Sequence, residues 1–208
     1  MSTLYDITPR ITEKLGVWPG DTPMTREMLC DIAKGDTVTL SSLHATVHLG
    51  AHADGPNHYG KDSATIDERD LDFYLGPCQV IHVEVERGSR VGIDQLPKGD
   101  IQAGRVLIGT GTFPDPENWN DDFAAIDPAL VDHLHEQGVM LIGIDTPSVD
   151  LIDSKDLQSH SRFLANDMAI LEGLVLKDVP EGVYELIALP LRLVGFDASP
   201  VRAVLREI

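Results

Sequence analysis

Short apolar runs bounded by turn-forming residues are the main pattern along this chain. Runs rich in Val, Ile and Leu cover residues 4–7, 79–85, 105–108 and 140–144. Each is too short for a typical helix and is predicted to be a strand. Residues 37–52 nearly alternate between polar and apolar side chains, which predicts one long strand or two. Residues 184–205 have the pattern of short strands joined by Pro190, Gly195 and Pro200.

Two segments have the pattern of helices. Asp127 and Pro128 can begin the first, because aspartate caps a helix and proline fits its first turn, and Gly138 can end it. The second covers residues 163–174, with Glu172 late in it among apolar neighbours, where it either has a partner such as a metal or faces solvent. Because strands outnumber helices and their connections are mixed, we expect an α/β fold with a mixed, largely antiparallel sheet.

Composition limits the class of protein. The 208 residues are predicted to form one domain, residues 1–208, and the 42% that are hydrophobic suffice for a substantial core. The formal charge of −18 opposes binding to nucleic acid or to an anionic membrane, because both require basic surfaces. The first residues have neither a basic start nor an apolar signal core, so we expect a cytoplasmic protein. Cys30 and Cys78 lack CxxC spacing and are predicted to be reduced thiols.

One short segment concentrates the groups that could carry chemistry. Its polar residues all occupy even positions, which share one face of an extended strand: His48, His52, Asp54 and His58. Imidazole and carboxylate groups bind zinc, manganese and iron, so a metal site explains the cluster better than a His-rich loop does. Four residues of straight strand span about 13 Å, too far for ligands of one ion. We therefore expect a bend at Gly50 and a turn at Gly55-Pro56 that returns His58 to the site.

Other segments have the residues of a pocket rim. Trp18 stands in a loop of turn formers, where it either anchors the loop on the core or stacks on a ligand. The sequence Gly109–Thr112 follows a buried strand and lacks the lysine of a P-loop, so it is predicted to be a tight turn near a pocket. Asp145 follows another buried strand, a common position for pocket residues.

The segment from His48 to His58 resembles the signature of the metal-dependent cyclase family, His-x-Gly-Thr-His-x-Asp-x-Pro-x-His, with Ala51 in place of the threonine. The similarity extends over the chain and includes the Trp18-Pro-Gly-Asp loop, residues 143–150, His160 and Glu172. The resemblance implies a swivelling β/β/α fold and a homodimer. The change at Ala51 puts in doubt a hydrogen bond around the ligands, and leaves the ligand set intact.

The resemblance also implies roles for individual residues. Two divalent metal ions per subunit are expected, usually zinc, with manganese as the alternative. His48, His52 and Asp54 would bind one ion, and Asp54, His160 and Glu172 the other. His58 would be the catalytic acid and base, and Trp18 would contact the aromatic ring of a small-molecule substrate.

Within the family the chain is most similar to bacterial arylformamidases, which implies hydrolysis of N-formyl-L-kynurenine in tryptophan breakdown, by water activated between two metal ions. An alternative is hydrolysis of a cyclic amide such as isatin. A more distant one is a cupin-like iron dioxygenase, although the usual His-x-His pair is absent. A metal-binding protein without catalytic activity is a further alternative. His58 is weak evidence against it, because a passive metal site needs no extra imidazole.

Overall fold

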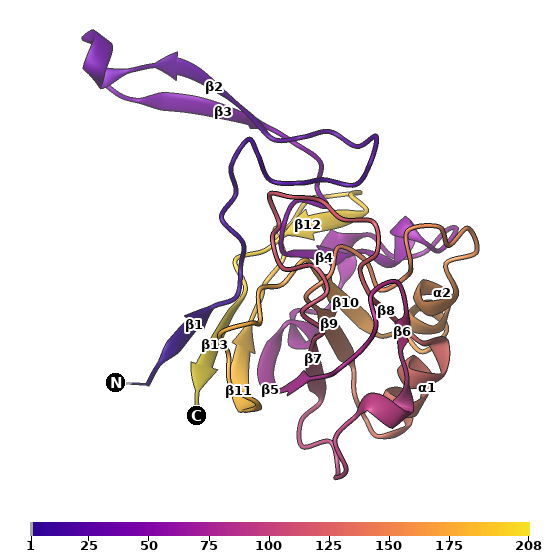
Figure 1. The fold of residues 1–208 in the computed structure, drawn as a ribbon. Coiled ribbons are helices and arrows are strands. Elements are labelled where there is room, and N and C mark those ends of the chain that lie inside the picture. Colours follow the sequence, from indigo (N-terminus) through magenta and orange to yellow (C-terminus); the bar gives the residue numbers. More distant parts are fainter. Residues whose placement is uncertain (1) are drawn as a thin grey trace.

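A curled nine-stranded sheet forms the body of the protein in the computed structural model, which describes residues 2–208 (Figure 1). The strand order is β1-β13-β11-β5-β7-β9-β10-β4-β12. The strands are β1 (Leu4–Asp6), β4 (His52–Asp54), β5 (Leu75–His82), β7 (Arg105–Gly109), β9 (Leu141–Ile144), β10 (Ala169–Glu172), β11 (Gly182–Ile187), β12 (Ala198–Pro200) and β13 (Val204–Glu207).

The sheet is mixed, as the sequence predicts. β5, β7, β9 and β10 pair in parallel, and the remaining neighbours pair antiparallel. These parallel strands form the middle of the sheet, and β7 and β9 have largely apolar sequences, because both of their faces are buried. Three parallel pairings in one sheet also differ from an antiparallel jelly roll, which a cupin-like dioxygenase would require.

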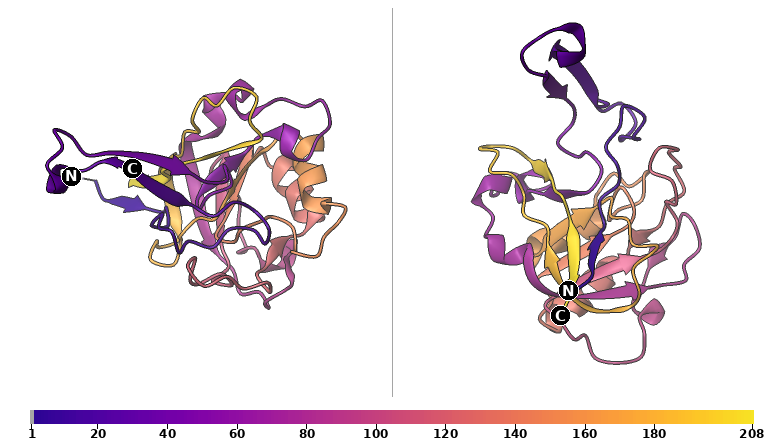
Figure 2. Two further views of the ribbon diagram at one scale, coloured as in Figure 1. Left: turned by 90° about the horizontal axis from the view of Figure 1, so that it is seen from above. Right: turned by 90° about the vertical axis from the view of Figure 1, so that its left-hand side faces the viewer.

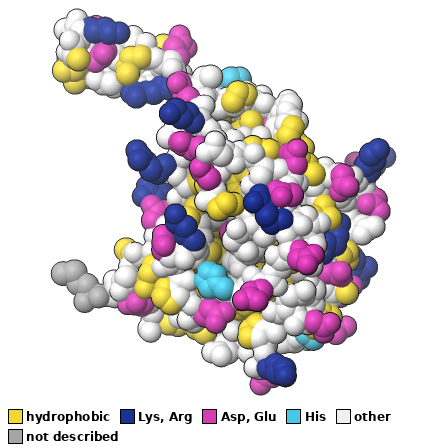
Figure 3. Space-filling model, in the orientation of Figure 1, with side chains coloured by type: hydrophobic (Ala, Val, Ile, Leu, Met, Phe, Trp, Pro, Cys, Tyr) yellow, Lys and Arg dark blue, Asp and Glu magenta, His cyan; other side chains and the backbone are white. Residues whose placement is uncertain are grey.

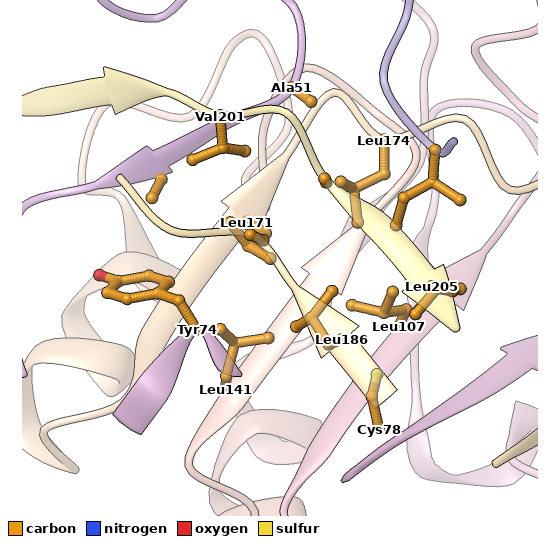
Figure 4. Packing of buried hydrophobic residues seen from close by; sticks show 14 of the residues in the cluster. Ala51, Tyr74, Cys78, Leu107, Leu141, Leu171, Leu174, Leu186, Val201 and Leu205 are labelled. Carbon is orange, nitrogen blue, oxygen red and sulfur yellow. The ribbon is translucent and has the colours of Figure 1, made fainter. Parts of the chain in front are cut away.

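Alternate residues of the central strands face two separate hydrophobic clusters. Leu107 and Leu171 belong to the cluster inside the curl of the sheet, which Figure 4 shows from close by. Ile108 and Ile170 belong to the cluster under the two helices, α1 (Pro128–Glu136) and α2 (Gln158–Ala165). Residues of even number on β10 therefore point toward the helices, and this side of the sheet also carries the candidate site.

The first predicted helix is confirmed, and the second is wrong. α1 begins at Pro128, as expected, and Gly138 follows its end with a φ of 85°. The segment predicted as a helix over 163–174 instead contains the end of α2 and the whole of β10. Asp167 has a φ of 49°, a left-handed conformation that ends the helix and turns the chain. The apolar residues after it gain more from pairing beside β9 than from another helical turn.

A two-stranded ribbon, residues 25–44, projects from the body (Figure 2). It contains β2 (Thr25–Cys30), β3 (Leu40–His44) and the short helix η1 (Ile32–Lys34) between them. The alternating region 37–52 thus contains one strand, β3, and only the first residue of β4, which belongs to the other sheet.

The remaining elements are short. β6 (Arg90–Val91) and β8 (Ala125–Ile126) pair in parallel, and four further 3₁₀ helices are η2 (Pro56–His58), η3 (Ile66–Glu68), η4 (Leu71–Phe73) and η5 (Ile93–Gln95). Within the described residues, every helix is too short or too polar to cross a bilayer.

Candidate active site

Strand pairing and helix packing bring four of the sequence-predicted residues together. β4 and β10 are antiparallel neighbours, and His52 lies directly opposite Glu172, so their side chains share one face of the sheet. Asp54, two residues along β4, points to the same side. His160 reaches this face from α2. His52 Nε2 lies 3.2 Å from Glu172 Oε2 and 3.5 Å from Asp54 Oδ1, and His160 Nε2 lies 3.5 Å from Asp54 Oδ2.

The bend and the turn predicted in the segment 48–58 are both present. Gly50 has a φ of 60°, so the chain bends between the first two histidines, and His48 Nδ1 lies 3.1 Å from Asp54 Oδ1. The helix η2 then turns the chain, and the His58 ring centroid lies 4.3 Å from that of His48. His58 also has a ring nitrogen within 4.8 Å of Asp54 and His160 ligand atoms.

The centre of this cluster fits a cation. His52 Nε2 and both carboxylate oxygens of Asp54 are buried and make no hydrogen bond of good geometry among the described residues, although ring nitrogens or carboxylate oxygens of other residues lie 3.1 to 3.5 Å away. Leaving such groups unpaired away from water costs about 1 to 3 kcal/mol for each, and more for a charged group. The atoms are of the types that bind zinc or manganese. The residues present therefore match a metal centre, with His48, His52 and Asp54 forming one group of close donor atoms.

The carboxylates of the cluster stabilise the protonated form of the neighbouring histidines. Burial lowers the pKa of His160, but its hydrogen bond to Asp150 and the nearby Asp54 outweigh burial and raise the pKa to about 10. For His48, burial again opposes the shift, and Asp54 and Asp197 raise the pKa to about 9. Burial would raise the pKa of Asp54, yet the neighbouring His160 and His48 hold it well below its usual range. An electrostatic field that favours imidazolium also favours a divalent cation.

Asp150 orients His160, a role that local sequence patterns did not predict. Its Oδ2 atom accepts a hydrogen bond from His160 Nδ1 at 2.9 Å. The same carboxylate accepts the backbone N–H groups of Ser159 and His160, so it also caps the first turn of α2. Arg90 donates to its other oxygen at 2.9 Å. The result is a fixed imidazole whose Nε2 faces Asp54, the arrangement that commonly supports a histidine ligand.

Asp197 is the second residue that the sequence did not reveal. It immediately precedes β12 and lies at the open edge of the cluster. Its Oδ2 atom is 3.1 Å from His48 Nε2 and 3.5 Å from His58 Nδ1. Nothing in its local sequence, a loop of Gly, Phe and Asp, marks it as functional.

A cavity of about 510 Å³ opens beside the cluster. Aromatic side chains form one wall, with Trp18 36% exposed and its ring centroid 5.8 Å from that of Trp119. Phe113 completes this wall, at 5.4 Å from Trp119. Trp18 thus both packs on its loop neighbours and faces the cavity. Trp119 and Phe113 were missed, because aromatic residues in an acidic loop give no signal of which cavity they will line.

Besides the histidines of the cluster, the ionisable residues that line the cavity are acidic. They are Asp21, Asp145 and Glu172, and neither lysine nor arginine is among the described lining residues. Asp145 accepts hydrogen bonds from the backbone N–H groups of Thr110 and Gly111, so the segment 109–112 lies next to a residue that lines the cavity. Burial raises the pKa of Asp145.

Comparisons with known proteins agree with this geometry. A family model described as "Putative cyclase" matches residues 5–151. A solved structure described as a potential metal-dependent hydrolase with cyclase activity is 27% identical, with a TM-score of 0.87 over 100% of this chain and 99% of that chain. A predicted metal-dependent hydrolase from Bacillus stearothermophilus is 28% identical, with a TM-score of 0.85 and 100% of both chains covered.

An isatin hydrolase bound to the product analogue thioisatinate is 18% identical, with a TM-score of 0.86 over 99% of this chain and 92% of that chain. At this identity the likeness shows a common fold. Together the matches confirm the expected cyclase-family fold over the whole chain.

Proposed function

The chain belongs to the Putative cyclase family, and from that premise we propose that it is a metal-dependent hydrolase that converts N-formyl-L-kynurenine to L-kynurenine and formate. One observation carries the proposal. Buried donor atoms of His52 and Asp54 that lack a good hydrogen bond lie beside a cavity with an aromatic wall. A passive metal site would need no cavity and no additional imidazole, whereas His58 lines this one.

Two divalent ions are proposed, zinc or alternatively manganese. His48, His52 and Asp54 would hold one, and Asp54, His160 and Glu172 the other. When bound, such ions polarise a carbonyl oxygen and lower the pKa of water to near 7, which supplies a nucleophile at neutral pH. Asp150 would keep the His160 imidazole aligned through the hydrogen bond of 2.9 Å from His160 Nδ1.

His58 is proposed to move the proton. Water adds its oxygen to the formyl carbon, and His58 accepts the proton that the water loses. The C–N bond then breaks, and His58 returns that proton to the departing aryl nitrogen, which would otherwise leave as a high-energy anion. The products are formate and the free aromatic amine. With 36% of its side chain exposed, His58 is the most exposed of the four histidines that line the cavity.

The cavity walls support an orientation for the substrate. The aromatic ring would lie against Trp18 and Trp119, where a ring pair contributes about 0.5 to 1.5 kcal/mol beyond burial of area. Asp21 and Asp145 are the lining carboxylates outside the proposed ligand set, so the α-ammonium group would face one of them and the α-carboxylate would point to the opening. Electrostatic complementarity of this kind favours a cationic over an anionic substituent.

The proposed function predicts formamide hydrolysis that depends on metal. The purified protein should convert N-formyl-L-kynurenine to kynurenine, lose this activity after chelation and recover it with zinc. Ultraviolet absorbance of the product is the measurement. The same assay should include isatin and formylkynuramine, which lacks the carboxylate and should be accepted at least as well. Faster turnover of isatin would replace the proposed substrate by a cyclic amide.

We also propose that the protein is a homodimer in which the ribbon of residues 25–44 contacts a second copy. Figure 3 shows hydrophobic side chains on this projecting ribbon. Its exposed large hydrophobic residues are Met28, Leu29, Ile32, Val38, Leu40 and Leu43. An isolated hairpin of two strands is only marginally stable in water, so a packing partner is expected.

A second copy fits as the partner for two reasons. The loop 189–196 exposes a matching apolar surface of Leu189, Leu191, Val194 and Phe196, so two copies could bury both patches symmetrically. The ribbon itself has two basic and three acidic side chains, so it is nearly neutral. Its electrostatic repulsion from a second, strongly acidic chain is therefore weak.

Sedimentation velocity should therefore find a dimer, and Leu43→Glu should shift it toward the monomer. Leu43 is 67% exposed on the ribbon. Leu4, 63% exposed on β1, gives the matched control Leu4→Glu, which should stay dimeric. A monomeric wild-type protein, or equal effects of the two substitutions, would contradict the ribbon as the interface.

A further inference from the structure

Asp197 contacts both His48 and His58 at the edge of the site, and it has no part in the proton transfers proposed above. Its Oδ2 atom lies 3.1 Å from His48 Nε2 and 3.5 Å from His58 Nδ1. The side chain is 45% exposed. Water could solvate a carboxylate at this position, so burial does not explain why the group faces two imidazoles.

The backbone fixes Asp197 against the segment that carries His58. The carbonyl of Asp197 accepts the N–H of Gly55 at 2.8 Å, and the carbonyl of Phe196 accepts the N–H of Ile66 at 3.0 Å. A Cβ atom on Gly55 would lie 2.9 Å from Ile66 N and 3.2 Å from Asp197 O. Glycine at this position of the histidine-rich segment thus permits the close approach of the two chains, and that approach brings the carboxylate to His58.

We propose, on the premise of the function above, that Asp197 is the positioning residue of His58. A carboxylate beside Nδ1 stabilises the tautomer with hydrogen on that nitrogen and leaves the lone pair on Nε2. Nε2 is then the atom that accepts the proton of water and returns it to the leaving nitrogen. The shared oxygen also ties His58 to His48, so the proton carrier keeps a constant place relative to the proposed ligands.

Leaving-group chemistry separates this role from a purely structural one. In a formanilide the C–N bond breaks with transfer of the proton from His58 to nitrogen, so a misaligned imidazole slows the reaction. In phenyl formate the C–O bond can break without that proton, because phenolate is a stable leaving group. The ester still needs His58 to accept the proton of water, but not to protonate the leaving group, so loss of positioning should slow formamides much more than the ester.

The test compares Asp197→Asn and Asp197→Ala with wild type on formanilide and phenyl formate, the ester corrected for spontaneous hydrolysis. Formanilide kcat should fall about 10- to 100-fold, the usual effect of removing a residue that orients a catalytic or ligand histidine. KM and metal content by elemental analysis, with zinc in excess, should stay within about twofold, and ester turnover should fall much less than formanilide turnover, as expected when proton transfer to the leaving group is the step most impaired. Asp132→Asn is the control, since Asp132 binds Arg162 outside the cavity.

Three outcomes would overturn the inference. Loss of metal in Asp197→Asn would place its role at the metal centre, either as a ligand or through its hydrogen bond to His48, and not at His58. An equal fall for ester and formamide would show that protonation of the leaving group is not the step that Asp197 supports, and no fall would show no role. If wild-type protein hydrolyses neither substrate, the proposed function itself fails, and that result differs from all three.

Discussion

Replacing His58 with alanine should lower the turnover of N-formyl-L-kynurenine by about 10²- to 10⁴-fold, the usual contribution of general acid and base catalysis. His58 lines the cavity and is the most exposed histidine of the cluster, so its removal should leave the buried ligand atoms in place. Steady-state kinetics and elemental analysis on the same preparation measure both effects. Metal content should remain at the wild-type level.

The metal measurement decides between two roles for His58. Its ring nitrogens lie close enough to Asp54 and His160, and to His48 and Asp197, to belong to either group of donor atoms. If His58→Ala loses metal together with activity, the residue is a ligand. If it retains both, the proton is carried elsewhere. His133→Ala is a suitable control, because that histidine lies on α1 outside the active-site cavity.

The second large effect is expected at Glu172. The variant Glu172→Gln keeps the size of the side chain and an oxygen that can accept the Val149 N–H, now at 2.7 Å from Oε1. It removes a buried negative charge next to His52 Nε2 and His160 Nε2, at 3.2 Å and 3.7 Å. Metal affinity should fall by more than about 100-fold, beyond the usual effect of changing a residue outside the ligand set.

Metal content and thermal unfolding with added zinc measure this loss. Free ligand at about 100 times its Kd stabilises a protein by about 2.7 kcal/mol, so the wild type should unfold at higher temperature with zinc and the variant should not. Glu185→Gln is the matched control, because Glu185 pairs with Arg206 on neighbouring strands. Full metal occupancy in Glu172→Gln would remove Glu172 from the proposed ligand set.

Glu172 also shows where sequence reasoning failed. Its neighbours are apolar on both sides, and short apolar runs do not distinguish a buried helix from a buried strand. The prediction of a helix over 163–174 was therefore wrong, although the residue itself was selected through the family resemblance. In a helix the neighbouring turns would determine where the Glu172 side chain points. In β10 its position follows from strand pairing, which sets it opposite His52 of β4.

Asp150 and Asp197 illustrate a different limit. Asp150 lies within the segment 143–150 that resembles the family, but nothing local indicates that it caps α2 and holds His160. Asp197 reaches His58 only because its loop pairs with the segment around Gly55. Both contacts join residues far apart in the chain, and composition and periodicity contain no information about such pairs.

The sequence by itself determined which chemical groups were available and how polar and apolar positions alternate along the chain. Three features could be interpreted from short-range chemistry and backbone geometry alone. They are the imidazoles and the carboxylate at even positions, the glycines between them, and the apolar runs of the strands. The tertiary structure alone decided which of these groups meet. Pairing of β4 with β10, packing of α2 on the same face and the approach of Asp197 all depend on long-range burial of apolar surface, which acts on the assembled fold and leaves no local signature.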